Sequence, residues 1–333
     1  MKAYILKRYN KEAKLELADV AKPLVKENEV LIEIFAAGLN LLDSKLKKGE
    51  FKLLLPYKLP LILGHDLAGV IKEIGKNVRD FKVGDEVYAR ASDYHIGTFA
   101  EYISIDEQDV ALKPKKLSME EAASVPLVGL TAWQALVEKA KLKKGQKVFI
   151  QAGSGGVGTI AIQLAKYLGA TVATTASANN FELVKRLGAD VMIDYRKDDF
   201  ETVLKDYDVV LNSQDDKTLF KSLNILKPNT KLISISGPPD VDFAREIGLP
   251  WLMRIIIYFL SRKVSRRATK LGIDYSFLFM KASGKQLAEI TSLIEQGHIK
   301  PVVDKIFTFD ETNEALEYIE AGRSKGKVVI KIK

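Results

Sequence analysis

The chain has 333 residues, of which 47% are hydrophobic and 28% charged, as expected for a globular protein large enough for two domains. It contains no cysteine, which excludes disulfides, thiolate nucleophiles, iron–sulfur clusters and cysteine-ligated zinc. Its net charge of +8 comes mostly from lysines scattered among nearly as many acids, a pattern that suits an anionic cofactor and does not predict nucleic-acid binding.

The N-terminal third has the pattern of a small β-barrel. The first residues, MKAYILKRYNKEAKLEL, lack the apolar core of a signal peptide, so we expect a cytoplasmic protein. A turn is expected at Gly38, and this part ends near Pro114. The strand-like runs are separated by turn residues and lie at 3–6, 30–34, 67–74, 86–89 and 99–103.

Strands and helices alternate in the middle of the chain. Ser118 and Glu121 form a capping box that begins a helix, Pro126 breaks or bends the chain after it, and residues 130–140 are helical in pattern. Strands are predicted, with helices between them, at 147–151, 171–175, 191–193, 208–211 and 231–235. This alternation predicts an α/β domain with a doubly wound parallel sheet.

The last fifty residues do not continue this alternation. A capping box at Ser283 begins a helix to Glu295, and a helix over 310–320 and a strand over 327–332 come after it. We expect this segment to return to the N-terminal barrel. The predicted domains are therefore a barrel domain over 1–124, a nucleotide-binding domain over 125–282, and a return to the barrel domain over 283–333.

Residues 147–177 contain the strongest functional motif. A predicted strand leads into Gly153-Ser154-Gly155-Gly156-Val157-Gly158, with the spacing G-x-G-x-x-G, and the helical pattern after it ends at Gly169. In that context the first glycine permits a tight turn, the second lets a pyrophosphate approach the backbone, and the third lets helix and strand pack closely. The helix N-terminus adds free N–H groups. A dinucleotide site is favoured over a glycine turn that binds nothing.

The residues after the next strand bear on the choice of coenzyme. NAD enzymes place an Asp or Glu about 20 residues past the first glycine. Here residues 174–180 read TTASANN and contain no carboxylate. Hydroxyl and amide groups can donate hydrogen bonds to a 2′-phosphate, which favours NADPH. A polar turn that caps a helix beginning near Asn180 would explain the same residues.

Residues 249–271, LPWLMRIIIYFLSRKVSRRATKL, contain the only dense basic cluster. The apolar run 249–260 is interrupted by Arg254 and is too short to span a bilayer. One hypothesis is a helix that shields the active site or contacts another subunit, and the other is an interfacial helix that brings the protein to anionic membranes. We favour the first, because a buried cofactor needs shielding from water. The cluster itself consists of Arg262, Lys263, Arg266, Arg267 and Lys270.

Seven motifs succeed one another between residues 29 and 330: GLNLLD at 38–43, GHDLAGV at 64–70, VGDEVY at 83–88, GTFAEY at 97–102, LVGLTAW at 127–133, the glycine loop, and GKVV at 326–329. Together they resemble the medium-chain dehydrogenase/reductase superfamily, on its zinc-free quinone oxidoreductase branch, which includes plant alkenal/one oxidoreductases. The resemblance implies a GroES-like β-barrel beside a Rossmann domain, with the active site in the cleft between them.

The chain departs from the superfamily pattern at the positions of the zinc ligands. Its zinc alcohol dehydrogenases need three protein ligands, typically Cys, His and Cys. His65 is present here, but Leu41 or Leu42 and the region of Val128 stand where the cysteines are expected, so His65 is interpreted as a hydrogen-bonded barrel residue. Without a Lewis acid, hydride transfer to an electrophilic quinone or to an α,β-unsaturated ketone or aldehyde is favoured over alcohol oxidation.

The resemblance also implies roles for individual residues. Asn40 and Thr131 would contact the nicotinamide and its ribose, Ser177 and Tyr195 would surround the 2′-phosphate, and Ser154, Gly155, Gly156 and Val157 would hold the pyrophosphate. Many quinone oxidoreductases carry a lysine where this chain has Asn180, which weakens the expected preference for NADPH. The nicotinamide half would be lined by Asn212, Ile235, Phe277, Leu278 and Phe279, and Lys327 is a further expected cofactor contact.

Two candidate catalytic residues also have structural explanations. The phenol of Tyr57 could donate a hydrogen bond to a developing enolate, but packing beside Pro56 and Pro60 explains this residue equally well. Asp43 stands three residues after Asn40, which is also the spacing of an N-cap and its N3 partner.

The favoured function is an NADPH-dependent, metal-independent reductase of small quinones or activated alkenes. The alternatives are an enzyme resembling a metal-free alcohol dehydrogenase, and a non-catalytic protein that binds NADPH as a sensor or scaffold. The resemblance further implies a homodimer, paired through an edge strand of the cofactor domain near 275–280.

Overall fold

A computed structural model describes residues 1–52 and 55–333, which form two compact units. The first unit comprises Met1–Leu130 together with Lys281–Lys333, and the second comprises Thr131–Met280. The two ends of the chain therefore belong to one unit, and the second unit is a continuous insertion within it.

The first unit contains two sheets. The smaller is antiparallel, in the order β2 (Glu16–Asp19), β1 (Lys2–Leu6), β4 (Leu61–Ile62). The larger has the order β15-β16-β3-β5-β6-β8, with β7 also paired to β3, and is antiparallel except between β15 and β16. Its strands are β3 (Glu29–Leu39), β5 (Asp66–Ile74), β6 (Glu86–Arg90), β7 (Tyr102–Asp106), β8 (Val110–Leu112), β15 (Val303–Thr308) and β16 (Lys327–Lys331).

Two predictions for these strands were wrong. Gly38 does not form a turn but continues β3, opposite Asp66 of β5 and Val329 of β16. A Cβ atom at Gly38 would lie 2.3 Å from the carbonyl oxygen of Ala123, so the glycine permits a close approach of backbone. The strand expected at 99–103 begins only at Tyr102, because residues 99 and 100 bond to β1 instead.

Most helix boundaries in the first unit agree with the predicted caps. Ser118 Oγ accepts the N–H of Glu121 at 3.1 Å, and a Glu121 carboxylate oxygen accepts the N–H of Ser118 at 3.0 Å, which confirms this capping box. Ser283 Oγ likewise accepts the N–H of Gln286. The helices are α1 (Leu41–Lys48), α2 (Met119–Ala123), α10 (Gly284–Glu295) and α11 (Thr312–Glu320), and α3 (Pro126–Trp133) crosses the boundary between the units.

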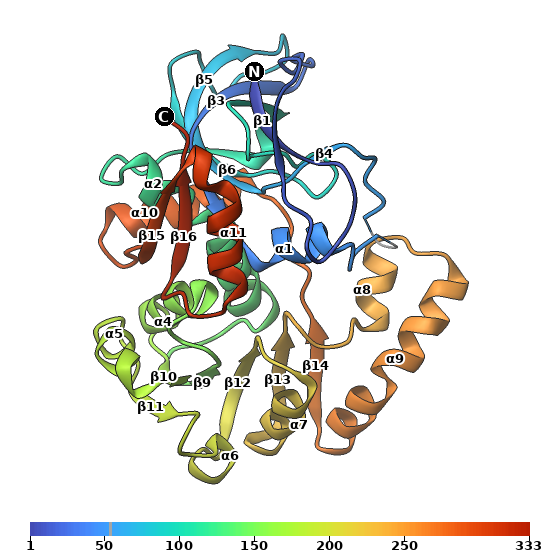
Figure 1. The fold of residues 1–333 in the computed structure, drawn as a ribbon. Helices are drawn as coiled ribbons and strands as arrows, with labels where there is room; N and C mark the ends of the chain where they lie inside the picture. The colour runs from blue at the N-terminus through green and yellow to red at the C-terminus, as the bar shows by residue number, and fades with distance from the viewer. Residues whose placement is uncertain (53–54) are drawn as a thin grey trace. The chain divides into compact units, whose positions relative to one another are not determined.

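The second unit is built on a six-stranded parallel sheet, as predicted (Figure 1). Strand order reverses beside the first strand in sequence, which is the arrangement of a doubly wound nucleotide-binding sheet. In spatial order the strands are β11 (Val191–Asp194), β10 (Thr171–Ala176), β9 (Lys147–Ile150), β12 (Tyr207–Asn212), β13 (Leu226–Ser234) and β14 (Ile273–Phe277).

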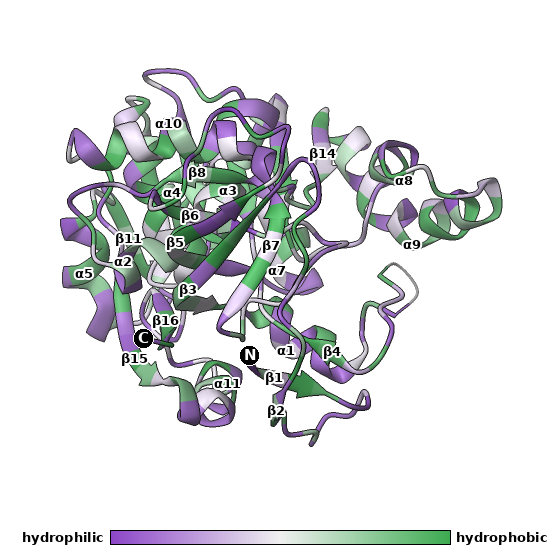
Figure 2. Ribbon diagram, turned by 90° about the horizontal axis from the view of Figure 1, so that it is seen from above, coloured by the Kyte–Doolittle hydropathy of each residue, from purple (hydrophilic) through white to green (hydrophobic). Residues whose placement is uncertain are grey.

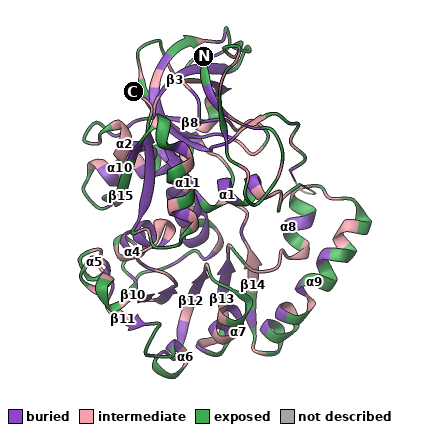
Figure 3. Cartoon of the chain, in the orientation of Figure 1, coloured by how far each residue is buried: buried purple, intermediate pink, exposed green. Residues whose placement is uncertain are grey.

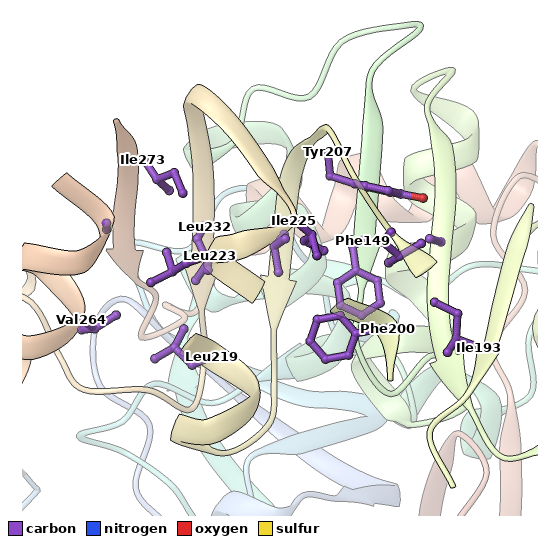
Figure 4. Close-up of a cluster of buried hydrophobic side chains, with 14 residues drawn as sticks. Phe149, Ile193, Phe200, Tyr207, Leu219, Leu223, Ile225, Leu232, Val264 and Ile273 are labelled. Carbon is purple, nitrogen blue, oxygen red and sulfur yellow. The ribbon is translucent and has the colours of Figure 1, made fainter. Parts of the chain in front are cut away.

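Helices pack on this sheet in two groups. Helices α4 (Gly156–Tyr167) and α5 (Phe181–Arg186) contact strands β9 to β11. Residues of α6 (Phe200–Val203), α7 (Asp216–Asn224) and α9 (Trp251–Lys270) share a separate buried cluster with the strands, and α8 (Val241–Glu246) packs against α9. The cluster, shown in Figure 4, includes Phe149, Ile193, Phe200, Leu219, Leu232, Val264 and Ile273.

Candidate functional site

The predicted cofactor residues of the second unit gather at one edge of its sheet. Every strand there is parallel, so the carboxyl ends of all six strands lie at the same edge, which is where such sheets bind nucleotides. Six of these positions or runs stand at a strand end or within three residues of it. These positions are Gly153 after β9, Ser177 after β10, Tyr195 after β11, Asn212 ending β12, Ile235 after β13, and Phe277 to Phe279 at the end of β14.

The glycine loop has the geometry of a phosphate-binding turn. Helix α4 begins at Gly156 with Gly155 as its N-cap, so its first N–H groups face the loop, and it ends before Gly169, whose φ of 80° is left-handed as predicted. At Gly155 an added Cβ would meet only the carbonyl oxygen of Ala152, at 3.3 Å. At Gly158 the same atom would lie 2.3 Å from that oxygen. The loop therefore has the arrangement expected of a dinucleotide turn, with one tight contact at its second glycine and much closer packing at its third.

The first glycine acts differently from the prediction. The left-handed residue of the turn is Ala152, with a φ of 50°, rather than a glycine. Gly153 is required instead by the neighbouring strand, because a Cβ there would lie 2.2 Å from the hydroxyl oxygen of Thr174. Its N–H donates to the carbonyl oxygen of Thr175 at 2.9 Å, which fixes the loop against β10.

The residues expected near a 2′-phosphate are polar and partly exposed. Asn180 Nδ2 donates to Ser154 Oγ at 3.1 Å, while its buried Oδ1 has no hydrogen-bond partner in the described part of the chain. Tyr195 is 59% exposed, and the guanidinium carbon of Arg196 lies 5.7 Å from its ring centroid. Arg196 thus places a positive charge one residue beyond Tyr195, and sequence reasoning did not single it out.

A buried amide network supports the end of β12. Asn212 Nδ2 donates to Gln151 Oε1 at 2.7 Å, and Ser234 Oγ donates to Asn212 Oδ1 at 2.7 Å. The amide of Gln151 also donates to Ser222 Oγ at 2.8 Å. The main-chain N–H of Ile235 donates to the carbonyl oxygen of Asn212 at 3.0 Å. These bonds hold three strand ends in a fixed relation, and Gln151 and Ser234 have no sequence motif that would have revealed them.

Aromatic side chains pack against one another at the end of β14. Phe277 and Phe279 lie with their ring centroids 5.1 and 5.8 Å from that of Phe243 in α8. The N–H of Phe277 donates to Asp240 Oδ2, and the N–H of Leu278 donates to the carbonyl oxygen of Ser234. The predicted lining residues are therefore rigidly held, although β14 ends at Phe277, two residues earlier than the predicted strand.

In the first unit, Asn40 and Asp43 form the predicted cap of α1. Asp43 Oδ2 accepts the N–H of Asn40 at 2.8 Å, which confirms the N-cap and N3 pairing. Asp43 Oδ1 lies 2.6 Å from His65 Nδ1, and both side chains are fully buried. His65, directly before β5, is therefore hydrogen-bonded to α1, in agreement with its interpretation as a hydrogen-bonded residue of this unit, and its Nε2 has no partner in residues 1–52 and 55–333.

A second buried pair adjoins this cap. Asp66 Oδ2 accepts from Asn40 Nδ2 at 3.0 Å and lies 3.2 Å from Lys327 Nζ, while Asp66 Oδ1 accepts the N–H of Leu127. Lys327 Nζ also donates to Asn40 Oδ1 at 2.5 Å and to the carbonyl oxygen of Leu39. Burial raises the pKa of Asp66, while the Lys327 ammonium and the Asn40 amide oppose that rise. Asp66 was not among the predicted site residues.

Tyr57 is half-buried in the same unit. Its hydroxyl donates a hydrogen bond to the carbonyl oxygen of Asp93, and its main-chain carbonyl accepts from Tyr9. Burial, reinforced by the negative charge of Asp93, raises the pKa of this phenol. The phenol is thus held as a neutral donor, and its role toward a substrate stays a prediction.

The metal-ligating side chains do not form a metal centre. Throughout residues 1–52 and 55–333, no three or more His, Cys, Asp or Glu residues are grouped so that they could hold a metal ion. His65 turns one ring nitrogen to Asp43, and the chain has no cysteine to supply the thiolates of a zinc alcohol dehydrogenase. Its donor set does not fit a catalytic zinc. Thr131, the remaining predicted residue, is buried in α3.

Two family models match the chain. Residues 26–115 match the alcohol dehydrogenase GroES-like domain, and residues 187–330 match a domain described as zinc-binding dehydrogenase. The second description is that of the model, and the ligand set of this chain does not correspond to it.

Named relatives and solved structures align over nearly the whole chain. An NAD(P)H oxidoreductase RTN4IP1, mitochondrial, from Danio rerio is 35% identical, with 100% of this chain and 91% of that protein aligned. An NADPH-dependent alkenal/one oxidoreductase, chloroplastic, from Arabidopsis thaliana is 34% identical over 99% of this chain and 79% of its own length. The quinone oxidoreductase of Coxiella burnetii superposes with a TM-score of 0.87 at 31% identity, covering 100% of this chain and 99% of that one.

Proposed function

Because this chain belongs to the quinone oxidoreductase branch of the medium-chain dehydrogenase/reductase superfamily and is an oxidoreductase of the NAD(P)H-dependent type, we propose that it reduces quinones or α,β-unsaturated ketones and aldehydes with NADPH. The observation that supports this most directly is the glycine loop at the head of α4, where Gly155 is the N-cap and is less crowded than Gly153 or Gly158. The proposed acceptor classes are those that need no Lewis acid, because no group of side chains in residues 1–52 and 55–333 could hold a metal ion.

In this mechanism the protein binds the coenzyme and orients it toward the acceptor. NADPH, when bound, supplies the hydride, and a proton from solvent or a side chain completes the reduced acceptor. The N–H groups at the start of α4 bind the pyrophosphate, and the Gln151–Asn212–Ser234 network fixes the strand ends that support the nicotinamide. Tyr57 is the proposed donor to the oxygen on which charge develops, and Asn40 and Thr131 are the proposed contacts of the nicotinamide ribose.

Steady-state NADPH oxidation tests the proposal. We expect turnover with 9,10-phenanthrenequinone or an enone and no loss of activity after treatment with a metal chelator. Binding of NADPH without turnover of any acceptor in a broad panel would point to a sensor or scaffold. Chelator-insensitive reduction of NADP⁺ by a simple alcohol would instead support an alcohol dehydrogenase.

Arg196 allows a test of coenzyme preference. We propose that it pairs with the 2′-phosphate beside Ser177 and Tyr195, compensating for the absence of a lysine at Asn180. Arg196→Gln should then raise the KM for NADPH about tenfold or more and leave that for NADH unchanged, because a hydrogen bond to a charged group contributes about 1.5–3 kcal/mol. The neighbouring Lys197→Gln is the matched control. Equal changes with both coenzymes would remove Arg196 from the phosphate site.

We further propose a homodimer in the cytoplasm. Within the described residues β14 pairs only with β13, so its outer edge is available for a second copy. Sedimentation velocity should give a mass twice that of the chain, and a monomer at micromolar concentration would contradict the proposal. No helix in residues 1–52 and 55–333 is long and apolar enough to cross a bilayer.

A further inference from the structure

Helix α9 presents two different faces. Its inner face consists of Ile257, Ser261, Val264 and Ala268, which are buried and recur at intervals of four, three and four residues. Two of these residues, Val264 and Ala268, belong to the buried cluster shared with the sheet. This face attaches α9 firmly to its unit and determines which residues must point away from it.

The outer face of α9 carries a stripe of six residues, here called the outer stripe, whose side chains change from apolar to basic halfway along the helix. The residues of the outer stripe are again three or four apart, and all six are exposed. Figure 3 shows that much of α9 is coloured as exposed. The first half of the stripe is apolar and the second half is basic, and Figure 2 shows α8 and α9 with both hydrophobic and hydrophilic stretches. In order, the stripe consists of Leu252, Ile255, Phe259, Lys263, Arg266 and Lys270.

The exposed apolar surface is unusually large for one helix. Leu252, Ile255 and Phe259 are 58%, 45% and 61% exposed, and Trp251 at the start of α9 is 68% exposed. Ile256, Tyr258 and Leu260 extend the same surface. Contiguous patches of this kind mark interaction sites rather than ordinary protein surface.

The basic half of the helix is not neutralised by its surroundings. Residues 251–270 contain no Asp or Glu. None of Arg262, Lys263, Arg266, Arg267 or Lys270 pairs with a carboxylate in the part of the chain that the structure describes. Arg267 donates to the side-chain oxygen of Asn224, and Lys263 lies over the ring of Phe220. The partner of this surface must therefore supply both apolar volume and negative charge.

We propose that α9 is a membrane-interfacial helix that docks this protein on anionic lipid bilayers. This replaces the shielding helix favoured from sequence alone, because the apolar and basic residues of the stripe are exposed. Its apolar half would enter the boundary between head groups and acyl chains, with Trp251 in the interfacial region, while its basic half would contact lipid phosphates. A second copy of α9 fits this surface less well, because residues 251–270 contain no Asp or Glu and could not supply the negative charge that the basic half requires. The proposal concerns binding to lipid and is independent of the proposed oxidoreductase activity.

Vesicle co-sedimentation of the full chain tests this. We expect binding to phosphatidylcholine vesicles that contain about one-third phosphatidylglycerol, little binding to pure phosphatidylcholine, and release at high salt. The triple variant K263Q/R266Q/K270Q should bind at least tenfold more weakly, and L252S/F259S should lose binding as well. The control K143Q/K144Q/K205Q removes the same charge from exposed lysines of the same unit and should bind like the wild type.

Tryptophan fluorescence provides a second readout. The chain has two tryptophans, and the exposed Trp251 should shift its emission to shorter wavelength on anionic vesicles. Trp251→Phe should abolish this shift while Trp133 remains. Circular dichroism of each variant separates loss of binding from loss of folding, and L252S/F259S in particular removes no buried side chain.

Three results would overturn the proposal. The first is absence of binding to anionic vesicles. The second is binding that the outer-stripe variants and the control weaken equally, since that would be nonspecific attraction of a basic protein. The third is a dimer that L252S/F259S dissociates, because the apolar half would then be covered by a second copy. NADPH oxidation with a soluble quinone, measured without lipid, reports on the enzymatic proposal separately.

Discussion

At the scale of single residues, the glycine loop shows how one spacing serves two physical purposes. Gly158 lies against the carbonyl oxygen of Ala152, so it is required for packing whether or not a ligand is bound. A Cβ atom at Gly155 would meet the same oxygen at 3.3 Å, a tight contact that a shift of a few tenths of an ångström would relieve, so packing alone requires this glycine much less than it requires Gly158. Substituting each residue in turn therefore separates folding from binding.

We expect Gly155→Ala to fold like the wild type and to bind NADPH at least tenfold more weakly, because the methyl group would occupy the space of the pyrophosphate. Gly158→Ala should instead lower the melting temperature, since its Cβ meets backbone that cannot move aside. Calorimetric titration and thermal unfolding measure the two effects. Wild-type coenzyme affinity in Gly155→Ala would contradict the dinucleotide site.

The Asp66–Lys327 pair gives a second prediction at this scale. Lys327→Met would leave Asp66 charged and buried without its ammonium partner, which should destabilise the first unit by about 3 kcal/mol. Adding Asp66→Asn to that variant removes the unpaired charge and should recover part of the loss. Denaturation midpoints of the two single variants and the double variant test the coupling, and strictly additive effects would show that the pair does not act as a unit.

Elements depart from the sequence pattern where a distant segment competes for the same backbone. The local pattern at residues 99–100 predicts the start of a strand that continues to residue 103. In the structure these two residues pair with β1, and no pattern in the nearby sequence indicates that pairing. The helix predicted over 130–140 is also divided, into α3 and a π-helix over Gln134–Lys139. In contrast, helix caps depend only on neighbouring residues. The capping box at Ser118 is present, Ser283 caps α10 through its side chain, and both helices begin where predicted.

The short 3₁₀ helix Glu107–Asp109 provides an element-scale prediction. Burial, together with the negative charge of Asp106, raises the pKa of Asp109 to about 6. A carboxyl group whose pKa is raised on folding stabilises the fold below its unfolded pKa of about 4 and loses that contribution as the pH rises through about 6. Asp109→Asn should therefore be about 1–2 kcal/mol more stable than the wild type at pH 7.5, since one pKa unit corresponds to about 1.4 kcal/mol.

The measurement is urea denaturation at pH 7.5 and pH 4. The advantage of Asp109→Asn should disappear at the lower pH, where the wild-type carboxyl is protonated as well. Asp198→Asn, at an exposed position, serves as the control and should change neither midpoint. An advantage that does not depend on pH would mean that the Asp109 charge is not its source.

At the scale of the whole molecule, the continuous second unit contains the entire predicted phosphate site. NADPH should therefore stabilise this unit by about 2.7 kcal/mol at a concentration one hundred times its Kd. Scanning calorimetry should show the transition of residues 131–280 rising by several degrees, with a smaller effect from NADH. Equal shifts with both coenzymes would argue against NADPH preference, and the Arg196→Gln variant should behave in that way.

Much of the fold and part of the site could be predicted from sequence. The parallel sheet and the placement of Gly153 to Gly158 between strand and helix depend on local periodicity and chain order, which a single sequence contains. The residues that hold the site in place could not be predicted in this way, because their contacts are distant in sequence. Gln151 and Ser234 meet Asn212 from other strands, and Asp66 meets Lys327 across 261 positions of sequence, so only the folded chain brings them together.

The pairing of β16 with β3 has a consequence for synthesis on the ribosome. Val328 lies opposite Leu39, so β3 cannot pair with β16 until residues 327–331 have been translated. The inserted unit has by then emerged completely and can fold first. A nascent chain therefore carries residues 36–39 of β3 without their β16 partner for most of its elongation, and a premature stop codon before residue 327 would leave that part of the edge exposed to aggregation.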